Sequence, residues 1–208
     1  MDQLSQLPPI VWVLIAGAIA FGFGLSLLWR WYRRYRARKA LHTAVIAGTM
    51  DHLVDTLVPD GMGGGFHCDY VLLTQRGLVV VDLRDVRGNI FGADQMAEWT
   101  VMDGPHRFTF TNPQGALYDR IAAVKAVAGD VVVEGRIVFT RRARFPKGLP
   151  KWTLMLDGLR AEFPITDQVS PASETRFREA WQRLKAAVKP SYMADMSHTM
   201  KLRKLRLP

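Results

Sequence analysis

The chain has 208 residues, 28 Lys and Arg against 19 Asp and Glu, a formal net charge of +9, and one cysteine. This length is enough for one domain with a sizeable core, and a single cysteine excludes an internal disulfide, which suits a reducing compartment. Six basic residues lie at 30–39 and four at 201–206, which leaves 18 basic residues against all 19 acidic ones. Because the excess charge sits in two segments, composition supports a membrane surface as the partner at least as well as a nucleic acid.

Residues 10–29 contain no charged side chain, and a basic segment at 30–40 follows them at once. Twenty helical residues rise about 30 Å, the thickness of a bilayer's hydrocarbon core. A cleaved signal peptide would place basic residues before a shorter apolar core, so the pattern favours an uncleaved transmembrane helix. The basic side stays in the cytoplasm, so we expect a single-pass protein of the inner (cytoplasmic) membrane with residues 1–9 outside. The basic residues expected to contact anionic lipid are Arg30, Arg33, Arg34, Arg36, Arg38 and Lys39.

Residues 41–189 are expected to form one α/β domain, followed by a basic tail at 190–208. Apolar spacing predicts a helix at 40–58, and the glycines at 61–65 are interpreted as a connector that lacks the features of a phosphate-binding loop. A hairpin is predicted from strands at 66–74 and 78–83 with a tight turn at 75–77. Three successive valines at 79–81 indicate a strand buried on both faces.

The remaining elements follow from the same patterns of apolar residues and breakers. Strands are predicted at 88–91, 98–102, 107–111, 131–133, 136–140 and 152–156, and helices at 114–128 and 173–188. In the last helix, Phe177, Trp181, Leu184 and Val188 form an apolar stripe typical of core packing. The order of elements predicts an α/β fold around a mixed sheet flanked by helices.

Two acidic residues of the predicted hairpin are candidates for a site. Asp69 lies early in the first strand, Asp82 lies near the end of the second, and an antiparallel hairpin centred on Arg76 brings these positions together. Arg84 shares a strand face with Asp82. Two carboxylates and a backbone carbonyl, which would be that of Leu83, are suitable ligands for Mg²⁺, or Mn²⁺ as a substitute, and such a metal can activate water at a phosphodiester. The alternative is that these charges are solvated surface groups in weak ion pairs.

Several short motifs, in order, resemble the NERD (nuclease-related) domain family over residues 45–140. The motifs are Gly48 to Asp51, Asp69 with the apolar residues after it, the run at 77–84, Gly88-Asn89-Ile90-Phe91-Gly92, Trp99, and Asn112-Pro113 before a helix. The resemblance implies a restriction-endonuclease-like fold with a PD-(D/E)xK site. By this resemblance Asp69 and Asp82 would hold the divalent metal, Arg84 would take the place of the family's Lys, and Asp51 that of a Glu on the opening helix.

The sequence departs from the family where the chemistry would take place, because Glu-x-Lys is replaced by Asp82-Leu83-Arg84. An arginine can stabilise negative charge but cannot act as a base. Three hypotheses therefore stay open. The chain is a membrane-anchored nuclease that hydrolyses nucleic acid with a divalent metal; or a catalytically degenerate module that binds nucleic acid, anionic lipid or a protein partner at the membrane; or a membrane scaffold. The basic run Arg141, Arg142, Arg144 and Lys147 is either a phosphate contact or a solvated loop.

Overall fold

A computed structural model describes residues 9–164 and 171–191. The predicted N-terminal flank at 1–9 and basic tail at 190–208 therefore fall mostly outside the described residues. The chain divides into two units, residues 1–44 and 45–208. The first unit contains most of α1 (Pro9–Ile46), a helix of 38 residues. Within the described ranges, no helix is long and apolar enough to cross a membrane, so the transmembrane helix predicted at 10–29 is not supported.

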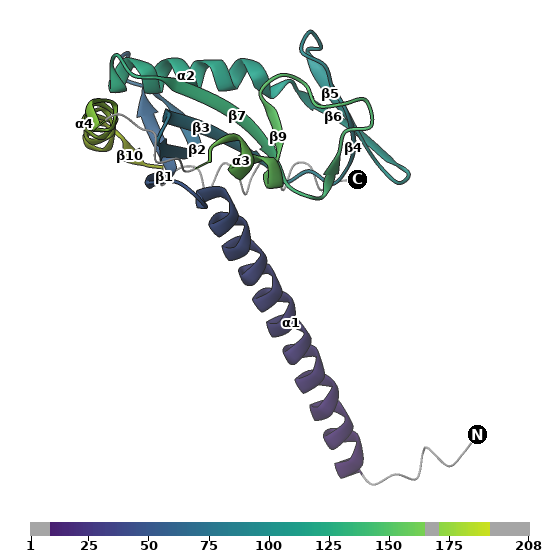
Figure 1. Cartoon of the computed structure of the whole chain (residues 1–208). Helices are drawn as coiled ribbons and strands as arrows, with labels where there is room; N and C mark the ends of the chain where they lie inside the picture. Colours follow the sequence, from purple (N-terminus) through teal and green to yellow (C-terminus); the bar gives the residue numbers. More distant parts are fainter. Residues whose placement is uncertain (1–8, 165–170, 192–208) are drawn as a thin grey trace. The chain divides into compact units, whose positions relative to one another are not determined.

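The second unit is built on a larger, six-stranded sheet in the order β10-β1-β2-β3-β7-β9 (Figure 1). Its strands are β1 (Asp51–Pro59), β2 (Gly65–Thr74), β3 (Gly77–Arg84), β7 (Val133–Phe139), β9 (Thr153–Met155) and β10 (Lys189–Pro190). The first four strands in this order are antiparallel, whereas β7 runs parallel to β3 and β9 runs parallel to β7. The predicted mixed sheet is confirmed, and so is the hairpin, whose turn requires the positive φ of 128° at Gly77.

A smaller sheet of four strands follows in the order β6-β5-β4-β8. Its strands are β4 (Gly88–Phe91), β5 (Glu98–Asp103), β6 (His106–Thr111) and β8 (Ala143–Arg144). The sequence predicted the first three strands but no strand at 143–144, because the two residues of β8 are too few to show an alternating pattern. β8 pairs in parallel with β4, more than fifty residues earlier in the chain.

The predicted helix at 40–58 is wrong beyond Ile46. The chain turns at Gly48, which has a φ of 84°, and then enters β1. The apolar residues of this segment fit a helix face by spacing alone. Pairing with β2, from Asp51 opposite Leu73 to Pro59 opposite Gly65, satisfies the backbone instead. Strand pairing therefore overrides the local pattern.

Three helices cover the larger sheet. They are α2 (Pro113–Ala128), α3 (Leu156–Glu162) and α4 (Pro171–Ala187). α2, which lies along the sheet in Figure 1, begins at Asn112, whose side-chain oxygen accepts the N–H of Gln114 at 3.0 Å. It packs closely on β7, because a Cβ added to Gly135 would lie 2.4 Å from Cδ1 of Ile121. The helices predicted at 114–128 and 173–188 are confirmed, whereas α3 was not predicted.

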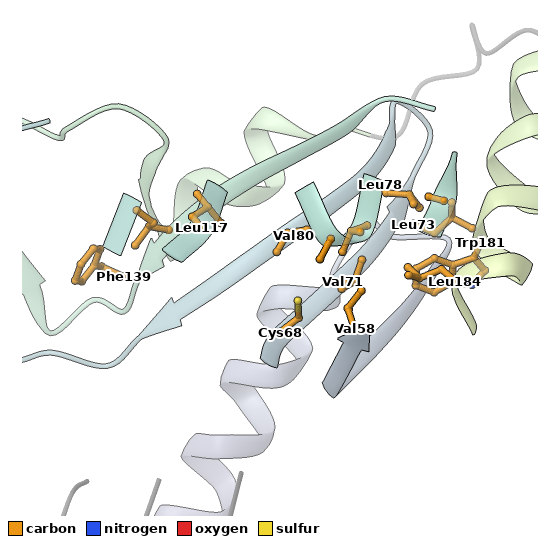
Figure 2. Packing of buried hydrophobic residues seen from close by; sticks show 14 of the residues in the cluster. Val58, Cys68, Val71, Leu73, Leu78, Val80, Leu117, Phe139, Trp181 and Leu184 are labelled. Carbon is orange, nitrogen blue, oxygen red and sulfur yellow. The ribbon is translucent and has the colours of Figure 1, made fainter. Parts of the chain in front are cut away.

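Both faces of the larger sheet are buried. The main cluster lies on the face with α2 and α4, where Figure 2 shows Trp181 and Leu184 next to Leu73 and Leu78. This confirms that the stripe on α4 is core packing. A second cluster on the other face contains Val79, Val81 and residues of α3. The burial of the valines at 79–81 on alternating faces is therefore confirmed.

Candidate functional site

The two candidate aspartates lie directly beyond the last pair of the hairpin. β2 and β3 pair Tyr70 with Val81 and Val71 with Val80, and Asp69 and Asp82 are the next residues along the two strands. The ladder ends before Asp69, whose Oδ2 accepts the backbone N–H of Leu83 at 2.9 Å. Thus Asp69 reaches across to β3 at the point where the two strands stop pairing.

The pKa of Asp69 responds to the charge of Asp82. Burial raises the pKa of Asp69, and the negative charge of Asp82 raises it further. The N–H of Leu83 and the positive charge of Arg84 act in the opposite direction but do not cancel the effect. The structure therefore brings together three of the residues that the sequence singled out, namely Asp69, Asp82 and Arg84.

Asp82 is almost fully buried, at 2 % exposed, and two arginines neutralise it. Its Oδ2 accepts from Nη2 of Arg84 at 2.8 Å and from Nη1 of Arg120 at 3.0 Å. Arg120 lies on α2 and also donates from Nε to the backbone carbonyl of His67 at 2.6 Å. Sequence reasoning missed Arg120, because only the packing of α2 on the sheet brings it to Asp82.

Arg84 is permanently charged and partly unsatisfied. Burial acts to lower its pKa, but the charge of Asp82 and the hydrogen bond with it outweigh burial, and the pKa is raised. Its Nε is buried and has no hydrogen-bond partner among the described residues. An unsatisfied buried donor costs about 1–3 kcal/mol, so an oxygen atom of a ligand would be favourable at this position.

The backbone is strained at Asp55, which lies beside the acidic pair formed by Asp69 and Asp82. Along β1 and β2 the ladder is interrupted between its paired positions only where Asp55 faces Asp69. Asp55 has a φ of 52°, which is unusual for a residue other than glycine. His67 lies between the carboxylates of Asp55 and Asp69. Its Nε2 lies 2.5 Å from Oδ1 of Asp55, and its Nδ1 lies 3.7 Å from Oδ1 of Asp69. The sequence carries no local signal for this arrangement, which depends on the pairing of β1 with β2.

The backbone carbonyl of Leu83 is a third oxygen on the side of β3 that faces Asp69. In a strand the N–H and C=O of one residue point to the same side, so the carbonyl of Leu83 faces the side on which its N–H reaches Asp69. Two carboxylates and this carbonyl fit part of a Mg²⁺ shell, which waters and a phosphate complete. The described residues contain no group of three or more His, Cys, Asp and Glu that could hold a metal ion. A metal here would therefore depend on the carbonyl and on the substrate for its remaining ligands.

Asp51 lies apart from this cluster. It pairs with Leu73, four residues along β2 from Asp69, which corresponds to about 13 Å of strand. Its Oδ2 accepts from Nε1 of Trp181 at 2.7 Å and from Nζ of Lys185 at 3.2 Å. The structure therefore places Asp51 on a strand, against α4, and does not bring it to the acidic pair.

The basic run at 141–147 divides into two kinds of residue. Arg141 forms an ion pair with Asp157 at 2.7 Å, and Arg142 forms one with Asp85 at 2.9 Å. Within the described residues no such ion pair holds Arg144 or Lys147, and both side chains are exposed. Arg144 and Lys147 can therefore bind an anionic ligand without losing a carboxylate partner.

A comparison with family models adds the decisive observation. The model of the nuclease-related domain, NERD, matches residues 35–140, slightly more than half of the 208 residues. The chain belongs to the NERD family. The comparisons with curated proteins and with solved structures found no match. The NERD match contains Asp69, Asp82, Arg84 and Arg120, whereas α3 and α4 lie beyond it.

Proposed function

We propose that this NERD domain hydrolyses phosphodiester bonds of nucleic acid with a divalent metal, at a site formed by Asp69 and Asp82. The observation that supports the proposal is the hairpin register, which pairs Tyr70 with Val81, the neighbours of Asp69 and Asp82. Continued by one position, this register would bring the two carboxylates to facing positions of β2 and β3. We also propose that the larger sheet follows the restriction-endonuclease-like plan, with a PD-(D/E)xK-type site at the end of the hairpin.

Each residue of the site has a distinct task in this proposal. Asp69, Asp82 and the carbonyl of Leu83 would hold Mg²⁺, or Mn²⁺ as its substitute. When bound, the metal would supply an activated water and neutralise charge on the phosphodiester. Arg84 and Arg120 would bind the phosphate oxygens, and the buried Nε of Arg84 is an unused donor for this purpose.

In this proposal, Asp82 exchanges its arginine partners for the metal ion. Two guanidinium groups hold Oδ2 of Asp82. A divalent cation bound to the carboxylates would repel these arginines, whereas a phosphate beside the metal would attract them. We therefore expect metal and phosphodiester to bind cooperatively, and metal alone to bind weakly.

A second candidate is binding of nucleic acid without hydrolysis, and two observations favour it. Arg84 stands in the place of the family's Lys and cannot accept a proton. The ion pairs on Asp82 also give a buried carboxylate a stable partner without any metal. In this case the phosphate contacts alone would account for the function, and anionic lipid or a protein partner at the membrane are the other ligands this module could bind.

The test is cleavage of labelled DNA and RNA, single- and double-stranded, by the full chain with Mg²⁺, with Mn²⁺ and with EDTA. Asp69→Asn and Asp82→Asn should each reduce the rate on the order of 100-fold. Asp130→Asn is the matched control, because the Asp130 side chain is fully exposed. If the wild-type chain leaves every substrate intact with both metals, hydrolysis is excluded. Salt-dependent binding that survives Asp82→Asn would then establish the second candidate.

We further propose that α1 attaches the domain to a membrane. Its side chains include Phe21, Phe23 and Trp31, which are 65–74 % exposed, and a run of arginines follows. Lipid contact would remove this apolar surface from water, and the arginines would bind anionic headgroups. The proposal requires lipid contact and not a span. The cytoplasmic placement of the domain and the outward N-terminus stay predictions of the sequence.

A further inference from the structure

We propose that the outward face of the smaller sheet is a docking platform for the phosphate backbone of the nucleic acid that enters the Asp69–Asp82 site. The inference rests on the proposed function, because it names the surface that would present the substrate. It concerns β4, β5, β6 and β8, of which the sequence had singled out only Arg144 on β8 as a possible phosphate contact.

The platform consists of one row of side chains that crosses four strands. The register pairs Arg144 on β8 with Asn89 on β4, Asn89 with Met102 on β5, and Met102 with Arg107 on β6. All four side chains are exposed. Adjacent strands lie about 4.8 Å apart, so the two arginines are separated by about 14 Å at the backbone. The row is therefore an extended strip with a cation at each end.

The opposite face of this sheet is committed to the core. Trp99 and Val101 on β5 and Ile90 on β4 are at most 1 % exposed and belong to the main cluster. Side chains alternate between the two faces of a strand, so Met102 and Asn89 must face away from the core. This sheet therefore has one buried face and one free face among the described residues.

The charge of the platform fits an anionic partner. Segments 86–111 and 141–151, which make up the smaller sheet and its connections, hold seven Lys and Arg and three Asp and Glu. Of the acidic residues, Asp103 is paired with Arg87 at 3.3 Å, and Asp94 accepts hydrogen bonds from Gln114 and from the backbone of Lys151. Glu98 lies four residues along β5 from Met102, about 13 Å away.

The two arginines of the row are available for phosphate. Within the described residues, no carboxylate lies within ion-pair distance of Arg107 or Arg144. Their neighbours Arg141 and Arg142 are already paired with Asp157 and Asp85. An uncompensated exposed arginine loses little when it binds a phosphate, because it has no partner to release.

The smaller sheet is connected to the end of the larger sheet at which Asp69 and Asp82 lie. β4 begins four residues after Arg84, and β8 begins four residues after Phe139, which is the parallel partner of Arg84. Thr140 joins the two connections, since its N–H donates to the carbonyl of Arg84 at 3.1 Å and its hydroxyl donates to Asp85 at 2.7 Å. Four extended residues span about 13 Å, so the start of β4 lies within that distance of Arg84. A phosphate backbone bound along the row would continue from there toward Asp82.

The experiment measures how binding of a fluorescein-labelled 20-nucleotide single-stranded DNA to the full chain depends on salt, by anisotropy in EDTA. The variant is Arg107→Gln with Arg144→Gln. The matched control is Arg176→Gln with Arg178→Gln, which removes two exposed arginines from α4. Each lost phosphate contact should reduce the slope of log affinity against log salt by about 0.7, so the platform variant should lose about 1.4 and the control should keep the wild-type slope.

Three results would overturn the inference. A platform variant with the wild-type slope overturns the inference, and so does a control that loses as much as the platform variant. A wild-type chain that binds no DNA overturns it as well. Because binding is measured without metal, a failure of the proposed hydrolysis is seen separately, as intact substrate with Mg²⁺, and leaves a reduced slope in the platform variant as support for the docking surface.

Discussion

Nη1 of Arg120 on α2 lies 3.0 Å from Oδ2 of Asp82 on β3, which ties the helix to the sheet at the candidate site. Both side chains are largely buried. Without Arg120, the buried charge of Asp82 would be compensated by Arg84 alone, and a buried charge that loses a partner destabilises the fold. Arg120→Gln should therefore lower the free energy of unfolding by about 1–3 kcal/mol in urea titrations. Arg178→Gln on the exposed face of α4 should change it by less than about 0.5 kcal/mol, and equal losses in the two variants would contradict this role of Arg120.

The contact of Asp51 with α4 predicts a dependence of stability on pH. Burial acts to raise the pKa of Asp51, but hydrogen bonds from Trp181, His52 and Lys185 outweigh it and hold the pKa below 3.8. A carboxyl whose pKa is lowered by folding stabilises the fold above its unfolded pKa, and this contribution is lost as pH falls through the folded pKa. Between about pH 5 and pH 2, Asp51→Asn should therefore lose less stability than the wild-type chain. Parallel curves of unfolding free energy against pH would exclude this contribution.

The close approach of α2 to β7 predicts opposite effects for two glycine substitutions. A Cβ on Gly135 would lie 2.4 Å from Cδ1 of Ile121 and 2.9 Å from Cδ1 of Leu117, whereas one on Gly115 of α2 meets nothing within 4 Å. Gly135→Ala should destabilise the domain by about 1–3 kcal/mol through overpacking. Gly115→Ala should stabilise it by up to about 1 kcal/mol, because alanine favours the helix. Thermal unfolding of both variants checks this, and an unchanged melting temperature for Gly135→Ala would show that α2 can move away.

Cys68 should be chemically inert in the folded chain. It is fully buried, and burial raises the pKa of its thiol to about 12; Asp69 and Asp82 add to this, and Arg120 opposes it. The thiolate is the reactive form, so almost none is present at neutral pH. A disulfide-exchange reagent should detect close to no thiol in the native chain at pH 8 and one per chain in denaturant. Fast labelling of the native chain would show that the end of the hairpin opens.

Attachment of α1 to lipid should depend on charge and on salt. The full chain should float with vesicles that contain anionic lipid, because the arginines and lysine at 30–39 bind the headgroups. A chain in which Arg33, Arg34 and Arg36 are replaced by Gln should float less, by about 1 kcal/mol per residue in binding free energy at low salt. Equal flotation with neutral and anionic vesicles would leave only the apolar side chains of α1 as the contact.

Local sequence patterns predicted the hairpin, but they did not predict the pairing of segments with other strands. The alternation in 66–83 and the turn before Gly77 were sufficient to predict the hairpin, whose last pair, Tyr70 with Val81, lies next to Asp69 and Asp82. The same reasoning failed at 40–58, where apolar residues fit a helix by spacing but belong to β1. An isolated segment carries its own period, and it carries no information about the strand that will satisfy its hydrogen bonds.

By itself, the sequence determined an α/β domain with the motifs of the NERD family and the hairpin that carries Asp69 and Asp82, because a hairpin joins residues that are close in the chain. Only the tertiary structure decided which cations hold these carboxylates and which face of the smaller sheet is free. Arg120 comes from a helix 38 residues beyond Asp82, and Arg144 joins β4 across more than fifty residues. Such contacts depend on how whole layers pack, and no pattern of neighbouring residues encodes them.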